Sequence, residues 1–157
     1  MQKTAWEEMA TAVATRFAGG SVTSISRFSR GLHHYVFDVT SEEGRAFVVC
    51  LGEPQNEKYF EAAMSWHSRP APLGTPLRRI LAGGRHGLHP FFVLERIPGK
   101  DLEDVYDAPT TDQKREIAAA IVTIQTRVRR LPEGAGYGDA LAYEGHRSVG
   151  SPGARPG

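Results

Sequence analysis

The histidines and the one cysteine are the residues of this chain that could do the widest range of chemistry. Imidazole nitrogen and thiolate sulfur are common ligands of zinc and related metals. A metal site would need His33 or His34 to share one ion with others among His67, His86 and His89. Adjacent residues of an extended segment point to opposite sides, so His33 and His34 would not readily bind one ion. The spacing therefore does not favour a metal centre.

Cys50 is the single cysteine and lies in the apolar run of residues 46–51. A nucleophilic thiol needs a neighbouring base or positive charge, and no sequence feature marks one beside it. A small buried residue on a core strand is the simpler interpretation. One thiol also excludes an internal disulfide and the multi-cysteine zinc and iron–sulfur frameworks, which suits a reducing cytosol.

A short loop, residues 29–34 (SRGLHH), is a third candidate for chemistry. Gly31 would let backbone amides approach an anion, and a hairpin tip can fold over a nucleotide. An ordinary hairpin turn has the same sequence features, so both interpretations stay open on the residues alone.

Three arginines near one another, Arg127, Arg129 and Arg130, could suggest a patch for anions or nucleic acid. Cations in the last turn of a helix are already favoured by the helix dipole. The chain has 19 Lys and Arg against 18 Asp and Glu, a net charge of +1, so it has no basic excess for a phosphate backbone or an anionic membrane. We expect neither nucleic acid nor a membrane as a partner.

The length of 157 residues, with 40% hydrophobic and 24% charged residues, predicts one globular domain, or one domain and a tail, at roughly 150 residues per domain. No apolar run approaches the length of about 18 residues that a membrane-spanning helix needs. Glu7 and Glu8 stand where a signal peptide would begin its apolar region. We therefore expect a cytoplasmic protein.

The spacing of the apolar residues predicts the helices and strands that would position these residues. Thr4 and Glu7 have the spacing of a capping box, and apolar residues then recur every three or four positions until Gly19, which predicts a helix. From Val22 to Leu51 the period falls to about two, with breaks at residues 29–34 and 41–44. These breaks predict three antiparallel strands joined by hairpins.

The middle of the chain continues with a helix over residues 55–68, which Pro54 can begin. Two more strands are expected at residues 77–81 and 91–96, separated by the glycine-containing segment 82–87. The predicted fold class is therefore α+β: a five-stranded, mainly antiparallel sheet with one packed helix, flanked by N- and C-terminal helices.

The last predicted helix follows a second capping-box pattern at Thr110 and Gln113. Its apolar residues alternate by four and three over about two heptads, too few for a coiled coil: Ile117, Ile121, Ile124, Val128 and Leu131. Residues 132–157 hold 7 of the 17 glycines and 3 of the 10 prolines, so we expect a disordered tail there.

This order of elements, together with residues 90–102 (PFFVLERIPGKDL), resembles the N-terminal lobe of the aminoglycoside phosphotransferase family. These are small-molecule kinases with a protein-kinase-like fold. The resemblance covers about Val22 to Leu131, and residues 93–102 look like the strand, hinge and Pro-Gly-x-x-Leu passage into the second lobe. It implies four regions: an N-terminal helix (1–20), a nucleotide-binding lobe (21–102), a linker with the first helix of an incomplete substrate lobe (103–131) and the tail (132–157).

The resemblance implies where ATP would bind. In the family the loop between the first two strands covers the phosphates, which points to Arg30, Gly31 and His33. A lysine or arginine near the end of the third strand reaches the phosphates in relatives, and here that position is Cys50. A thiol can neither neutralise a phosphate nor hold a glutamate in an ion pair.

Two further regions of the ATP site follow from the resemblance. Glu61 matches the family's helix glutamate, and Glu57, one turn earlier, is the second choice. Glu95 and Ile97 match the hinge, where backbone carbonyl and amide groups recognise the adenine edge.

The catalytic part of the family is missing from the sequence. Relatives carry an His-x-Asp-x-x-x-x-Asn motif and then a magnesium-binding aspartate, and neither motif occurs here. We therefore expect a truncated member that holds most of the ATP-side half and has no turnover alone, whereas the complete enzyme would phosphorylate a small-molecule hydroxyl. The alternative is a non-catalytic nucleotide-binding or protein-interaction module, whose partner would cover the apolar side of the last helix.

Overall fold

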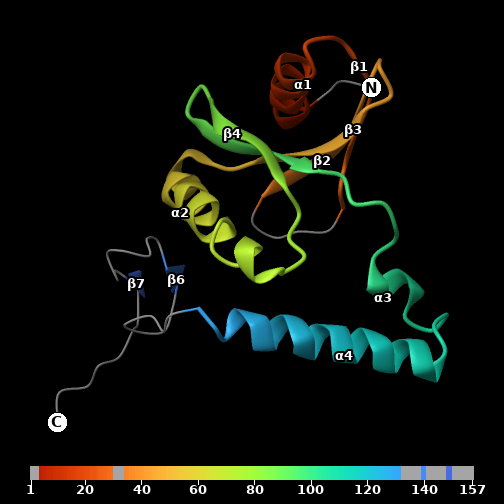
Figure 1. Cartoon of the computed structure of the whole chain (residues 1–157). Helices are drawn as coiled ribbons and strands as arrows, with labels where there is room; N and C mark the ends of the chain where they lie inside the picture. The colour runs from red at the N-terminus through yellow and green to blue at the C-terminus, as the bar shows by residue number, and fades with distance from the viewer. Residues whose placement is uncertain (1–3, 30–33, 132–138, 141–147, 150–157) are drawn as a thin grey trace. The chain divides into compact units, whose positions relative to one another are not determined.

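Five antiparallel strands make up one sheet in the part of the chain that the structure describes (Figure 1). The structure is a computed structural model, and it describes residues 4–29, 34–131, 139–140 and 148–149. The strands are β1 (Val22–Arg27), β2 (Tyr35–Ser41), β3 (Ala46–Leu51), β4 (Ile80–His86) and β5 (His89–Glu95), and their order in space is β1-β2-β3-β5-β4. The predicted α+β class and antiparallel sheet are confirmed.

The chain divides into two compact units. The first is Met1–Met64 with Arg78–Arg96 and contains the five-stranded sheet; the second is Ser65–Leu77 with Ile97–Gly157. Each unit has its own elements and is described by itself.

Helix α1 (Ala5–Ala18) covers one face of the sheet in the first unit (Figure 1). The predicted capping box at Thr4 and Glu7 is present, and Gly19 ends the helix in the left-handed conformation. The core between helix and sheet consists of buried small and apolar side chains: Ala10, Val13, Ala14, Phe37, Val39, Phe47, Val49, Leu51 and Val93.

Aromatic contacts join α1 to the sheet as well. The ring of Trp6 stacks on that of Tyr35 with centroids 3.7 Å apart, and Phe17 meets Phe47 edge to face at 5.1 Å. The helix face that the sequence marked as apolar is thus a packing surface.

Helix α2 (Glu57–His67) follows a short 3-10 turn, η1 (Pro54–Asn56), and lies on the other face of the sheet (Figure 1). Its Phe60 packs with Cys50 of β3 and Phe92 of β5 in a second, smaller cluster. The two faces of the sheet therefore carry different helices.

The sequence prediction for residues 82–87 is wrong, because most of this segment belongs to β4 and not to a connection. Gly83 pairs with Phe92 across the β4–β5 ladder. A Cβ atom on Gly83 would lie 3.2 Å from the Phe92 ring and 3.3 Å from the sulfur of Met64, so the glycine makes room for packed side chains. Only Gly87 and Leu88 are left to turn the chain, with Gly87 at φ 60°.

The second unit contains η2 (Ala71–Leu73), a short helix α3 (Leu102–Val105) and the long helix α4 (Thr111–Val128). The predicted capping box begins α4: the Thr110 side chain accepts from the Gln113 N–H at 3.3 Å, and the Gln113 side chain accepts from the Thr110 N–H at 2.8 Å. At the other end of α4, Arg127 donates to the carbonyl oxygen of Gly74.

The last described residues form a two-stranded antiparallel ladder, β6 (Asp139–Ala140) with β7 (Ser148–Val149). The remaining residues of the predicted tail lie outside the description. Among the residues that the structure covers, no helix is long and apolar enough to cross a membrane.

Candidate functional site

The sheet face that carries α2 is the candidate site. Residues two apart in a strand share a face, and Val36 and Leu94 pack against the cluster that contains Cys50 and Phe60 of α2. Asp38 therefore lies on this side too, since it follows Val36 by two residues. We call the part of this face formed by Val36, Asp38, Val48 and Leu94, with Phe28 and Arg96 at its ends, the candidate face.

Cross-strand register brings the members of the candidate face together. Asp38 of β2 pairs with Val48 of β3, and Val48 pairs with Leu94 of β5, so three neighbouring strands contribute one row. Val48 is buried and Leu94 is half-buried. The row is apolar except for Asp38, and apolar linings are common in sites that bind flat aromatic ligands.

Cys50 lies in β3 next to this row, with 8% of its surface exposed. Burial raises the pKa of its thiol to about 11, although the charge of Arg78 acts in the opposite direction. The thiol is neutral at pH 7, so it brings no positive charge to the position where the family resemblance places a cation.

The helix carboxylates differ in their contacts. Glu57, which the sequence offered only as the second choice, forms an ion pair with Arg85 of β4. Glu61 is exposed on α2. The sequence prediction missed Arg85 because it assigned residue 85 to a connection, whereas Arg85 lies in β4 and pairs with Pro90 of β5.

The predicted hinge begins at the end of β5. The backbone N–H of Glu95 donates to the carbonyl oxygen of Arg79 at 2.9 Å. The backbone group of Glu95 that could contact a purine edge is therefore its carbonyl oxygen. Its carboxylate accepts two hydrogen bonds from the Arg79 guanidinium, at 3.0 and 3.2 Å. These bonds lower the pKa of Glu95. Ile97, the other predicted hinge residue, is half exposed.

Arg96 reaches back over the sheet. Its Nε donates to Oδ1 of Asp38 at 2.9 Å, and its guanidinium carbon lies 5.7 Å from the centroid of the Phe28 ring. None of these three residues was among the predicted site residues, although Arg96 lies within the predicted hinge segment. Their contact depends on strand register, and the only signal in the sequence was one acid and one base on strands expected in the same sheet.

The predicted phosphate loop falls largely outside the described residues, which do not include Arg30, Gly31 or His33. The strands on either side of it are described. Arg27 pairs with Phe37, and the Phe28 N–H donates to the carbonyl oxygen of Val36 at 2.9 Å. The two strands are therefore antiparallel neighbours, as a hairpin requires.

The histidines do not come together in the described residues, which hold no group of three or more His, Cys, Asp or Glu side chains suited to a metal ion. His89 lies with Nδ1 3.1 Å from the carbonyl oxygen of Gly52, and His34 meets the Phe60 ring edge to face at 5.1 Å. Both rings thus contact other parts of the first unit.

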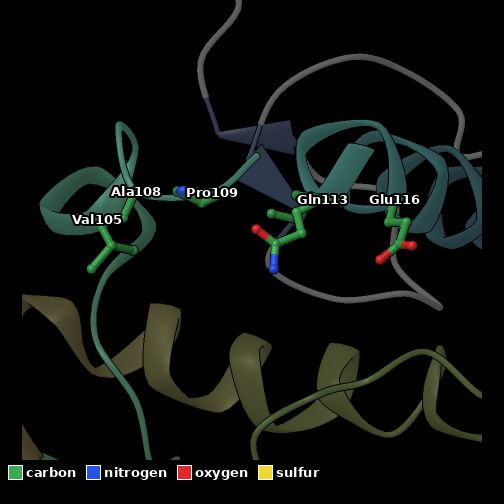
Figure 2. A pocket seen from close by; sticks show the side chains of 6 residues that line it. Val105, Ala108, Pro109, Gln113 and Glu116 are labelled. Atoms are coloured by element: carbon green, nitrogen blue, oxygen red, sulfur yellow. The ribbon is translucent and has the colours of Figure 1, made fainter. Parts of the chain in front are cut away.

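The second unit has a cavity of about 520 Å³ between α3 and the start of α4 (Figure 2). It is lined by Val105, Ala108, Pro109, Gln113, Glu116 and Ile117. The side-chain oxygen of Gln113 accepts a hydrogen bond in the capping box, so the polar side-chain groups of the lining that remain for a ligand are the NH2 group of Gln113 and the carboxylate of Glu116. Neither hinge residue belongs to this cavity.

The fold and the candidate face define a class of protein. A sheet in the order β1-β2-β3-β5-β4, with a helix after the third strand, is the arrangement of the N-terminal lobe of the protein-kinase-like fold. Residues 24–148 match the sequence model of the phosphotransferase enzyme family, and this chain belongs to that family.

Among solved structures, the chain is similar to the GDP and kanamycin complex of APH(2")-IIia, with a TM-score of 0.62 and 18% sequence identity. The match covers 83% of this chain and 43% of that chain, so this chain spans less than half the length of that protein. At this identity the likeness shows a shared fold. No curated protein matches the sequence closely enough to count as a relative.

Proposed function

We propose that this chain binds a purine nucleoside triphosphate on the candidate face, as the nucleotide-binding part of a kinase for small-molecule hydroxyl groups. Family membership supports the class of reaction. The observation that carries the proposal is the apolar row of Val48 and Leu94 beside the chain segment that leaves β5 at Glu95. ATP is the expected nucleotide, and GTP is included because the solved relative holds GDP.

The hinge and the loop would bind different parts of the nucleotide. The Glu95 carbonyl and the Ile97 N–H would meet the purine edge, while Arg30, Gly31 and His33 would lie at the phosphates. Arg30 carries the positive charge that the neutral Cys50 does not supply. We keep Glu61 as the proposed helix glutamate of the complete enzyme.

Phosphate transfer also requires a catalytic motif and ligands for Mg²⁺. The sequence contains no His-x-Asp-x-x-x-x-Asn motif, and the described residues hold no donor set that fits Mg²⁺. We therefore propose that this chain alone binds nucleotide and does not transfer phosphate. A reduced thiol and a nucleoside triphosphate both suit the cytosol, which we propose as its compartment.

Isothermal titration of the full chain with ATP, GTP and CTP, with and without Mg²⁺, tests binding. The proposal expects the purine nucleotides to bind more tightly than CTP, because a larger ring covers more of an apolar face. Absence of binding by both ATP and GTP would overturn it. A coupled assay for ADP in the presence of kanamycin tests transfer, and substrate-dependent turnover would contradict the non-catalytic part.

A second candidate, a protein-interaction module, is supported by α4, which has no buried residue. Ile121 is 48% exposed and Val128 38% exposed on this helix. Size-exclusion chromatography with light scattering separates the two functions, because a clean monomer that binds nucleotide supports the kinase lobe alone, and self-association supports the module.

A further inference from the structure

The ion pair between Asp38 and Arg96 joins two parts of the first unit that are 58 residues apart in sequence. Arg96 follows Leu94 by two residues, and Leu94 pairs with Val48, which pairs with Asp38. The Arg96 side chain must therefore cross β3 to reach β2. Both partners are only about one third exposed, at 32% and 34%, so the pair is partly shielded from water.

Arg96 also connects to the end of β1. Its guanidinium lies over the Phe28 ring at 5.7 Å, within the range of a cation–π contact. Phe28 is itself fixed to β2 through the hydrogen bond to Val36. The Arg96 side chain thus connects the start of the hinge with the two strands on either side of the loop at residues 29–34.

Glu95, the residue before Arg96, is bonded to a residue on the opposite side of β5. Glu95 bonds to Arg79 next to β4, through both its backbone N–H and its carboxylate. Consecutive residues of an extended segment point to opposite sides. The peptide between Glu95 and Arg96 is therefore restrained by Arg79 on one side and by Asp38 on the other.

We propose that Asp38 is a positioning residue for the purine. It holds Arg96, and through Arg96 it fixes the peptide after Glu95 relative to Phe28 and Val36 at the edge of the candidate face. The inference rests on the proposed function and adds to it a role for Asp38 that acts through Arg96 rather than through direct contact with the ligand. Its physical effect is preorganisation: the hinge does not have to be ordered when the ligand binds.

An Asp38–Arg96 pair that blocks the purine position would have the opposite effect on binding. If the Asp38–Arg96 pair lay in the place of the purine, the pair would have to open before binding. Loss of the pair would then tighten binding, whereas loss of a positioning contact weakens it. The sign of the change in affinity decides between the two roles.

The test is Asp38→Asn in the full chain, which removes the charge and keeps the shape. The ligands are adenosine and guanosine, which offer the purine alone, and inorganic tripolyphosphate, which offers the phosphates alone. We expect the dissociation constant for the nucleosides to rise about fivefold, the size of effect expected for a partly exposed ion pair. Binding of tripolyphosphate should stay unchanged.

Two further variants make the result specific. Asp112→Asn removes an ion-paired aspartate on α4, where Asp112 accepts from Arg115 at 2.8 Å, and it should leave nucleoside binding unchanged. The charge exchange Asp38→Arg with Arg96→Asp should recover most of the nucleoside affinity that Asp38→Asn loses. If Asp38→Asn does not fold, Arg96→Gln provides the same comparison.

Unchanged or tighter nucleoside binding by Asp38→Asn overturns the positioning role. Equal weakening for nucleosides and tripolyphosphate also overturns it, because that pattern indicates a general structural effect. A wild-type chain that binds neither nucleoside nor nucleotide overturns the proposed function and this inference with it. The wild-type titration comes first, so the two failures are told apart.

Discussion

The carboxylate of Glu57 in α2 forms an ion pair with the guanidinium of Arg85 in β4. In the kinase-like fold the corresponding helix is tied to a cation on the third strand, and the family resemblance places the neutral thiol of Cys50 at that position. The helix is thus anchored to the sheet through the fourth strand. The Glu57–Arg85 pair therefore connects α2 to the sheet without a cation on the third strand at Cys50.

Loss of this anchor should weaken the fold by a small, measurable amount. We expect Arg85→Gln and Glu57→Gln to be coupled by about 0.5 to 1 kcal/mol in a double-mutant cycle, the range for partly exposed ion pairs. Urea unfolding of the two single variants and the double variant measures it. Glu61→Gln, on the same helix but exposed, is the control and should show no coupling to Arg85→Gln. Strictly additive effects of Glu57 and Arg85 would contradict the anchoring role.

Gly52 allows the close approach of α2 to the sheet. A Cβ atom at this position would lie 2.5 Å from Cε2 of Phe60 and 3.1 Å from Cγ of Pro90. We expect Gly52→Ala to lower the free energy of unfolding by about 1 to 3 kcal/mol, as overpacking of a core does. Gly20→Ala is the matched control, because a Cβ atom there meets nothing within 4 Å. Equal stability of the two variants would show that α2 does not pack as described.

The thiol of Cys50 should react slowly while the protein is folded. Burial raises its pKa from 9.0 to about 11, so at pH 8 the folded chain holds about a hundredfold less thiolate than the unfolded chain. Iodoacetamide should therefore modify the folded protein at least about a hundredfold more slowly than the urea-unfolded protein. Similar rates in the two states would show that the side chain is not buried between α2 and the sheet.

The same shift predicts how stability depends on pH. Above pH 9 the unfolded chain loses the thiol proton and the folded chain keeps it until about pH 11. The unfolded state therefore binds fewer protons in this interval, and the contribution of Cys50 to stability is present below pH 9 and is lost as the pH rises to 11. Comparison of wild type with Cys50→Ala by urea unfolding at pH 8 and pH 10.5 measures it. A difference between the two proteins that does not change with pH would be inconsistent with the shift.

Glu95 should titrate as an acid that is held in its charged form. Hydrogen bonds from Arg79 lower its pKa below the ordinary value of 4.5. The pair therefore contributes to stability above the ordinary pKa and loses its contribution as the pH falls through the lowered value. A carboxyl-carbon NMR titration should give a midpoint below 4.5 for wild type and a higher one for Arg79→Gln. A wild-type midpoint at or above 4.5 would mean that the ion pair does not form in solution.

Local signals were enough to predict most elements of this fold. The capping boxes at Thr4 and Thr110 begin helices where the sequence indicates, because a cap uses only residues three positions apart. The extent of β4 was missed, because two adjacent glycines favour a turn locally. In the folded chain the ring of Phe92 and the sulfur of Met64 fill the space above Gly83, and that packing overrides the local preference.

The candidate site was less predictable than the fold. The proposed backbone recognition at Glu95 depends on position along the chain, and a family resemblance can predict that position. The pairs Asp38–Arg96 and Glu57–Arg85 join residues 58 and 28 positions apart, and they exist only in one strand register. A single sequence does not show which acidic residue pairs with which basic residue, because several of each lie on neighbouring strands and helices.

The most direct test of the central claim is where a purine nucleotide binds. In an NMR titration of ¹⁵N-labelled full-length chain with ATP and then GTP, the largest amide shifts should fall at Val36, Val48, Leu94 and Arg96. Shifts confined to residues that line the cavity between α3 and α4, or no shifts at millimolar nucleotide, would contradict a nucleotide site on the candidate face.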